Sequence, residues 1–164
     1  MFEVGRDESK GRSLFVMDLI RPDDMPELLA VPGPYFVCLL AWDARQASVA
    51  QISHVVERLQ RSGCVYLCCW GPDCERVHDV FDEVELGFSL EQEVEDEDGP
   101  ICMSTWHSNE PLSDAIWFTL NCTTPVEHSV DGCRSVIGLS IGSTQFAAEI
   151  RAAFVAPAKF NAGE

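Results

Sequence analysis

Three short segments of the sequence share one pattern, in which an apolar run ends on a tryptophan and polar or turn-forming residues follow at once. The segments are Ala41-Trp42-Asp43, Cys69-Trp70-Gly71-Pro72-Asp73 and Thr105-Trp106-His107-Ser108-Asn109-Glu110. Apolar runs of this kind are typical of buried strands, and a helical pattern follows each of them. In an open parallel sheet all such strand ends lie along the carboxyl edge, where α/β proteins build their ligand sites. The pattern therefore predicts where a ligand would bind, at the carboxyl edge of the sheet, but it does not predict an activity.

The succession of apolar runs and helical patterns predicts the fold class. We expect strands at 35–42, 64–70, 101–106 and 135–141, and helices at 48–62, after Asp73, at 111–120 and after Thr144. Ser48 is a suitable N-cap for the first helix. Four strand–helix units in a row favour a three-layer α/β/α domain with right-handed crossovers. The predicted sheet is mostly parallel and four- to five-stranded, with a flavodoxin-like or Rossmann-like topology.

If the four strands take the order 2-1-3-4, the crevice at the carboxyl edge falls between strands 35–42 and 101–106. A flat ring could then stack between tryptophans while polar side chains hold its edge. The candidate ligand-binding residues are Trp42, Asp43, Trp70, Asp73, Trp106, His107, Asn109 and Glu110. The alternative is that each tryptophan closes the core beneath a loop and each aspartate caps a helix.

The remaining segments have weaker patterns, and the whole chain of 164 residues fits a single domain. We expect an irregular lead-in over 1–33, in which 14–20 is either a strand or a docking segment, and a tail over 157–164. An acidic loop is predicted over 87–100, because 91–98 carries six carboxylates in eight residues. Their mutual repulsion favours a solvated loop, and a cation site or docking strip is the alternative.

The charge of the chain bears on its partners. Lys plus Arg number 11 against 27 Asp plus Glu, which gives a formal net charge of -16. Such a surface repels nucleic acid and anionic membranes and favours a basic protein partner. The alternative is that the charge serves solubility alone. No apolar run reaches the about 18 residues of a membrane-spanning helix, and the first 13 residues are too polar for a secretion signal. A cytoplasmic location is the expectation.

The eight cysteines have a structural interpretation and two chemical ones. Most lie inside apolar runs, where a reduced cysteine acts as a small hydrophobic residue. Cys69, Cys74, His78 and His107 could form a metal site, but the chain has no CxxC pair, so we expect no metal. Cys74 with His107 as its base is a conceivable nucleophile pair.

The sequence lacks the motifs of the common cofactor and hydrolase folds. It has no GxGxxG, no P-loop and no GxSxG nucleophile elbow, because Ser140 of the sequence 138–142 falls inside the predicted strand. We therefore expect no cofactor, and whether the protein is an enzyme stays open, with a noncatalytic role favoured.

The two longer tryptophan motifs carry a resemblance. The run Cys69-Trp70-Gly71-Pro72-Asp73-Cys74, with Thr105-Trp106-His107, Glu110-Pro111-Leu112 and Trp117-Phe118, resembles a family of small bacterial α/β domains of unknown function. The likeness covers about residues 34–154. It implies a bacterial cytoplasmic protein of α/β type and carries over no activity.

Two hypotheses for function follow. The first is a noncatalytic interaction or regulatory module that binds a basic protein partner through its acidic surface. The second is a binding protein or enzyme for a small planar or nucleotide-related ligand, which uses the crevice lined by Trp, Asp and His at the carboxyl edge. A convex acidic patch would favour the first, and a deep pocket holding Trp42, Trp106 and His107 the second.

Overall fold

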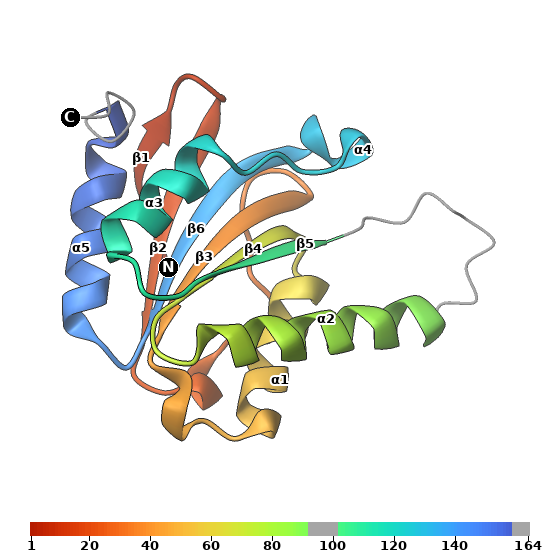
Figure 1. The fold of residues 1–164 in the computed structure, drawn as a ribbon. Coiled ribbons are helices and arrows are strands. Elements are labelled where there is room, and N and C mark those ends of the chain that lie inside the picture. The colour runs from red at the N-terminus through yellow and green to blue at the C-terminus, as the bar shows by residue number, and fades with distance from the viewer. Residues whose placement is uncertain (92–101, 159–164) are drawn as a thin grey trace.

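The computed structural model describes residues 1–91 and 102–158 and shows one six-stranded sheet between two layers of helices (Figure 1). The strands are β1 (Phe2–Asp7), β2 (Arg12–Leu19), β3 (Tyr35–Trp42), β4 (Cys64–Trp70), β5 (Met103–His107) and β6 (Cys133–Ile141). The helices are α1 (Val49–Arg61), α2 (Cys74–Glu91), α3 (Leu112–Asn121), α4 (Glu127–Val130) and α5 (Thr144–Val155), with short 3-10 helices η1 (Pro22–Asp24) and η2 (Ala44–Gln46). The predicted α/β class is confirmed.

Each face of the sheet buries its own apolar core. Helices α1 and α2 cover one face, together with residues of the segment that contains η1. Helices α3 and α5 cover the other face, as Figure 1 shows. Strands β2, β6, β3, β4 and β5 are parallel, and both faces of the central strands are buried, which explains why those strands read as continuous apolar runs.

The strand order differs from the one we expected. The sheet runs β1-β2-β6-β3-β4-β5, so β6 rather than β5 is the neighbour of β3, and there are six strands instead of four or five. Burial explains the arrangement: every residue of β6 except Arg134 is buried, whereas β5 is mostly half-buried or exposed. A strand that is apolar on both faces belongs inside the sheet, and the short polar strand belongs at its edge.

The lead-in over 1–33 was predicted to be irregular, with 14–20 as either a strand or a docking segment. The structure has the strand and a further strand before it, so the chain starts with a β-hairpin. Strand β1 pairs antiparallel with β2, and β2 pairs in parallel with β6. Gly5 lets β1 pass close to α5, because a Cβ at this position would collide with the carbonyl oxygen of Phe154. The N-terminal segment thus extends the sheet by two strands.

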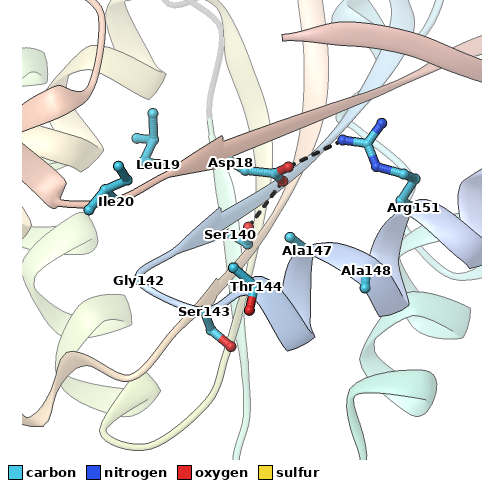
Figure 2. A pocket seen from close by; sticks show the side chains of 10 residues that line it. All are labelled: Asp18, Leu19, Ile20, Ser140, Gly142, Ser143, Thr144, Ala147, Ala148 and Arg151. Atoms are coloured by element: carbon cyan, nitrogen blue, oxygen red, sulfur yellow. Dashed lines mark hydrogen bonds and ion pairs between the residues drawn. The ribbon is translucent and has the colours of Figure 1, made fainter.

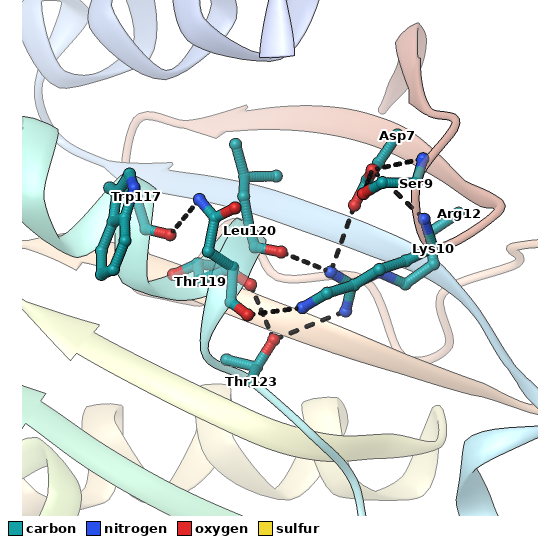
Figure 3. Close-up of polar contacts among 9 residues, drawn as sticks. Asp7, Ser9, Lys10, Arg12, Trp117, Thr119, Leu120 and Thr123 are labelled. Atoms are coloured by element: carbon teal, nitrogen blue, oxygen red, sulfur yellow. Dashed lines mark hydrogen bonds and ion pairs between the residues drawn. The ribbon is translucent and has the colours of Figure 1, made fainter. Parts of the chain in front are cut away.

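A buried ion pair fixes the hairpin to the end of α3 (Figure 3). The Arg12 guanidinium lies 3.5 Å from the Asp7 carboxylate and donates to the carbonyl oxygen of Leu120 at 2.8 Å and to Thr123 Oγ1 at 3.4 Å. The charged groups are shielded from water, and both terminal nitrogens of the guanidinium have hydrogen-bond partners, whereas the buried Nε of Arg12 has none. Partners of this kind offset much of the cost of burying a charge.

Other boundaries agree with the sequence or shift by a few residues. Ser48 caps α1, and its hydroxyl and the side chain of Gln51 form a capping box. Helix α2 continues to Glu91, so the first part of the predicted acidic loop is helical. The rest of that loop, and the tail from residue 159 onward, lie outside the described residues. Within residues 1–91 and 102–158, no helix is long and apolar enough to cross a membrane.

The connections diverge at the carboxyl end of β6. The chain leaves β2 toward η1 and leaves β3 toward α1, which lie on one face of the sheet, but it leaves β6 toward α5 on the opposite face. Neighbouring strands whose connections go to opposite faces leave an opening between them, and α/β proteins bind ligands in such openings.

Candidate functional site

A pocket lies at this divergence, between the carboxyl ends of β2 and β6 and the first turns of α5 (Figure 2). Its volume is about 490 Å³, which is within the range typical of small-molecule sites. It is lined by Asp18, Leu19, Ile20, Ser140, Gly142, Ser143, Thr144, Ala147, Ala148 and Arg151. The pocket therefore combines apolar walls with a small number of polar groups, the composition of a ligand site.

Three polar side chains form the centre of the pocket. Ser140 Oγ donates to Asp18 Oδ1 at 3.2 Å, and Arg151 Nη2 donates to Asp18 Oδ2 at 3.2 Å (Figure 2). Ser140 is only 1% exposed, whereas the side chains of Asp18 and Arg151 are 43% and 44% exposed. The serine thus orients a carboxylate that solvent, or a ligand, still reaches.

Strand pairing places Asp18 and Ser140 side by side. They are register partners in the parallel β2–β6 pair, so their side chains leave the sheet together. The same alternation puts Leu14, Val16 and Val136 on this face, where they pack beneath α5. Arg151 reaches the pair from the third turn of α5, so β2, β6 and α5 together hold this polar group.

The beginning of α5 forms the rim of the pocket. Gly142 makes the turn out of β6 with a φ of 73°, and its N–H donates to the carbonyl oxygen of Leu19 at 2.8 Å. Ser143 is the N-cap of α5 and accepts from the N–H of Phe146 at 3.2 Å. The N-terminal turn of α5, which carries a partial positive charge, therefore lines the same pocket as Asp18.

The three tryptophans named from the sequence lie at the carboxyl edge but in separate environments. Trp42 is 5% exposed and belongs to the core beneath α1 and α2. Trp70 lies on the opposite face, where its ring packs edge-on against Phe146 and its Nε1 donates to the carbonyl oxygen of Glu110. Trp106 is 48% exposed at the sheet edge. Because β4 separates β3 from β5, Trp42 and Trp106 do not face one crevice.

The two predicted aspartates make local contacts with arginines. Asp43 accepts two hydrogen bonds from the Arg45 side chain, which hold the pKa of its carboxyl below the usual value. Asp73 has a φ of 67° and accepts from Arg76 Nε at 2.7 Å. Arg76 also donates to the carbonyl oxygen of Ala44, so Asp73 helps to fix the start of α2 against the turn after β3.

His107 and Glu110 lie together on the α3 side of β5. His107 Nδ1 is 2.5 Å from Glu110 Oε1, and its Nε2 is 3.1 Å from Thr105 Oγ1. The imidazole is mostly buried and packs against the ring of Phe118. Asn109 takes a φ of 63° in the turn between them. The hydrogen-bonded chain of Thr105, His107 and Glu110 holds the loop that leads into α3.

The eight predicted residues therefore fall into several groups. Trp70 and Glu110 are joined by a hydrogen bond, and Glu110 is joined to His107. None of the eight is a lining residue of the pocket. Asp18, Ser140 and Arg151 were not among the candidate ligand-binding residues, and Ser140 was considered only as a nucleophile and rejected. One signal pointed to Asp18 and Ser140: each is a polar residue near the carboxyl end of an otherwise apolar run.

The cysteines contribute buried apolar surface. Six of the eight, including Cys68, Cys69 and Cys74, are buried and all eight are free. Burial raises the pKa of Cys68 to about 12 and also raises that of Cys74, which disfavours a thiolate at the position considered for a nucleophile. Among the described residues there is no group of three or more His, Cys, Asp or Glu side chains suited to a metal ion.

Residues 14–157 match the family model of a domain of unknown function (DUF7684). The chain belongs to this family. Comparisons with curated proteins and with solved structures find no match.

The DUF7684 match says which parts of the molecule the family shares. It begins inside β2 and runs past the end of α5, so it contains every residue that lines the pocket and all eight residues predicted from the sequence. Strand β1 lies before it. The pocket is therefore built wholly from the family domain.

Proposed function

We propose that the protein binds a small organic molecule in the pocket between β2, β6 and α5. The observation that carries this proposal is the Asp18 carboxylate, which is oriented by a buried serine and yet open to a cavity of about 490 Å³. A half-exposed acid in a concave, partly apolar site can exchange its contact with Arg151 for contact with a ligand at small cost, since exposed ion pairs contribute little stability.

The lining suggests the chemistry of the ligand. Leu19, Ile20 and Ala148 offer apolar surface to a flat or aliphatic group, and Asp18 accepts hydrogen bonds from hydroxyl or amino groups. The N-terminus of α5 and the guanidinium of Arg151 supply donors for an acceptor on the same molecule. The net charge of -16 disfavours a polyanion. A nucleoside or a compound with similar groups meets these conditions.

Part of the strand order supports the choice of a nucleotide-related ligand next to β6. If β3 is counted as the first strand, β5, β4, β3 and β6 have the order 3-2-1-4, with which dinucleotide-binding sheets begin. The chain lacks the glycine-rich turn that brings a backbone close to pyrophosphate. The proposed ligand is therefore the nucleoside part of such molecules and needs no phosphate contact.

A ligand screen with two matched variants tests the proposal. Thermal-shift measurements with nucleosides, sugars and amines identify a ligand, and isothermal titration then measures its Kd. Ala148→Trp fills the pocket, whereas Ala152→Trp places the same side chain one turn further along the exposed side of α5. We expect Ala148→Trp to weaken binding at least about tenfold and Ala152→Trp to leave it unchanged. Equal binding by both variants, or no stabilising compound, contradicts the proposal.

A second proposed function is the binding of a basic protein partner through an acidic surface. It is favoured by the exposed carboxylates along α2, of which Glu75, Asp79 and Asp82 are three or four residues apart and share one side of the helix. Binding of polylysine, followed by fluorescence anisotropy, should weaken steeply as the salt concentration rises. Binding without this salt dependence, or none at all, contradicts this function.

We place both proposed functions in a bacterial cytoplasm and regard them as noncatalytic. The resemblance of the tryptophan motifs to small bacterial domains and the six buried free cysteines support this setting. Fractionation of cells that produce the native protein tests the location.

A further inference from the structure

The sheet ends on β5, and one edge of this strand has no strand partner among the described residues. Strand β5 pairs in parallel with β4 on its inner side. The outer edge of such a strand presents N–H and C=O groups that can pair with an added segment of another chain. Figure 1 shows β5 at the margin of the sheet beside α2.

The side chains of β5 that point toward α2 make an accessible aromatic and polar surface. Ser104 Oγ donates to Asp82 Oδ1 at 2.6 Å, and the Trp106 ring packs edge-on against the His78 ring at a centroid distance of 4.6 Å. Trp106 nevertheless stays 48% exposed. An indole face at an open strand edge is a binding surface for a cationic side chain.

The neighbouring side of α2 is acidic. Asp79 and Asp82 lie on either side of the His78 ring, at 3.5 and 3.6 Å from its nitrogens. Glu75 lies one turn before Asp79 on the same side of the helix and is exposed. Arg76, on the same helix, is directed away to Asp73 and to the carbonyl oxygen of Ala44. The surface beside Trp106 therefore carries an excess of negative charge.

We infer that the outer edge of β5, together with Trp106 and the carboxylates Asp79 and Asp82, binds an extended segment of a partner protein in which lysine or arginine alternates with uncharged residues. The inference rests on the proposed binding of a basic partner and gives that function a location and a mode. The mode is addition of one strand to the sheet, with main-chain pairing for affinity and alternate side chains for specificity.

Strand geometry explains why the basic residues should alternate. Successive side chains of a strand point to opposite faces, so every second residue of an added segment would lie over α2. These positions are about 7 Å apart, and they would bring one cation to the Trp106 ring and another to the two aspartates. The intervening residues would lie on the α3 side, which presents no matching acids from β5 itself, since Met103 and Thr105 point there.

The test uses a fluorescein-labelled peptide of about eight residues, the length of a long strand, in which lysine and arginine alternate with threonine and valine. One control peptide has the same composition but carries its basic residues in one block. A second control peptide has glutamate in place of each basic residue. Anisotropy gives the Kd at low and at physiological salt, and amide hydrogen exchange reports on β5. We expect the alternating peptide to bind most tightly and to slow exchange in β5.

Matched variants locate the binding surface. Asp79→Asn with Asp82→Asn should weaken binding about tenfold, and Trp106→Ala about fivefold. Asp114→Asn with Glu127→Gln removes the same charge from exposed positions outside α2 and β5 and should change the Kd less than about twofold.

Two kinds of result distinguish a wrong binding site from a wrong proposal that the protein binds a basic partner. Equal weakening by both double variants, or binding with no protection of β5 amides, overturns the strand-addition site and leaves the basic-partner function standing. No salt-sensitive binding of any basic peptide or of polylysine overturns both. Circular dichroism of each variant establishes that the fold is retained.

Discussion

Two aspartate–arginine pairs lie near opposite ends of β2, and they differ most in their access to water. The side chains of Arg12 and Asp7, at the start of the strand, are 4% and 2% exposed, whereas those of Asp18 and Arg151, at its end, are 43% and 44% exposed. The separations of the charged groups are similar, at 3.5 and 3.2 Å. Distance alone therefore does not distinguish the pairs.

The surroundings of the two pairs indicate different roles. Arg12 also donates to α3, and Asp7 also accepts from Ser9 within the hairpin turn, so the buried pair joins two parts of the fold. Asp18 has Ser140 as its buried partner, while the rest of its surface faces the pocket. A buried charge must keep its partners, but a half-exposed charge can exchange them. The buried pair, Asp7 and Arg12, is therefore suited to stabilise the fold, and the exposed pair, Asp18 and Arg151, to bind a ligand.

Removing one arginine at a time should show that the two pairs contribute very differently to stability. Arg12→Met leaves the Asp7 carboxylate buried without its cation, so we expect a loss of about 3–5 kcal/mol in the free energy of unfolding. Arg151→Met removes a half-exposed partner and should cost less than about 1 kcal/mol. Urea unfolding followed by circular dichroism measures both, and similar losses for the two variants would remove the basis of the comparison.

A second substitution shows whether the lost charge partner causes the effect. In the Arg12→Met background, Asp7→Asn removes the uncompensated charge but keeps an oxygen that can accept from Ser9. We expect the double variant to recover about 1–2 kcal/mol relative to Arg12→Met. A further loss would mean that packing of the arginine stem, rather than the charge, accounts for the cost.

The fold was predictable where one segment carries its own signal. The apolar runs of β3, β4 and β6 and the N-cap at Ser48 required no knowledge of distant residues. The hairpin was missed because β1 has an exposed, largely polar pattern and gains its hydrogen bonds only from β2. Strand order was missed because it depends on which strands compete for the centre of the sheet, and β6 is more completely buried than β5.

For the candidate site, the sequence predicted only that it lies at the carboxyl edge of the sheet. Parallel strands do bring Trp42, Trp70 and Trp106 to the carboxyl edge, but alternation along each strand and the position of β4 separate them. Asp18 and Ser140 become neighbours through a pairing between residues 122 positions apart. No local sequence pattern predicts that β2 pairs with β6. Whether the predicted residues bind a ligand stays a prediction.

The interaction within the exposed pair, Asp18 and Arg151, can be measured directly. A double-mutant cycle with Asp18→Asn and Arg151→Gln keeps the shape of the Asp18 side chain and an oxygen that can accept from Ser140, and it removes both charges. We expect a coupling free energy of about 0.2–1 kcal/mol, which decreases as salt is added because the pair is open to solvent. A coupling that is larger and independent of salt would show that Asp18 is as firmly paired as Asp7 and poorly suited to exchange partners.

The smallest effect concerns a third acid, which is half-buried and hydrogen-bonded by neutral groups. Glu85 accepts from the N–H of Cys102 at 3.3 Å and from Gln60 Nε2 at 2.9 Å, and burial raises the pKa of its carboxyl above 4.5. The folded protein therefore holds this proton to a higher pH than the unfolded chain. Between the two pKa values folding takes up a proton, so this carboxyl lowers stability as the pH rises through that interval.

Glu85→Gln removes the titration while keeping an oxygen acceptor. Its stability relative to the parent protein should grow as the pH rises from below 4.5 and then level off above the folded pKa, by less than about 1 kcal/mol. Glu83→Gln, at an exposed position of the same helix, corrects for the change in net charge. Unfolding curves across this pH range decide the matter. If the variant loses stability relative to the parent protein as the pH rises, the hydrogen bonds to Glu85 outweigh its burial.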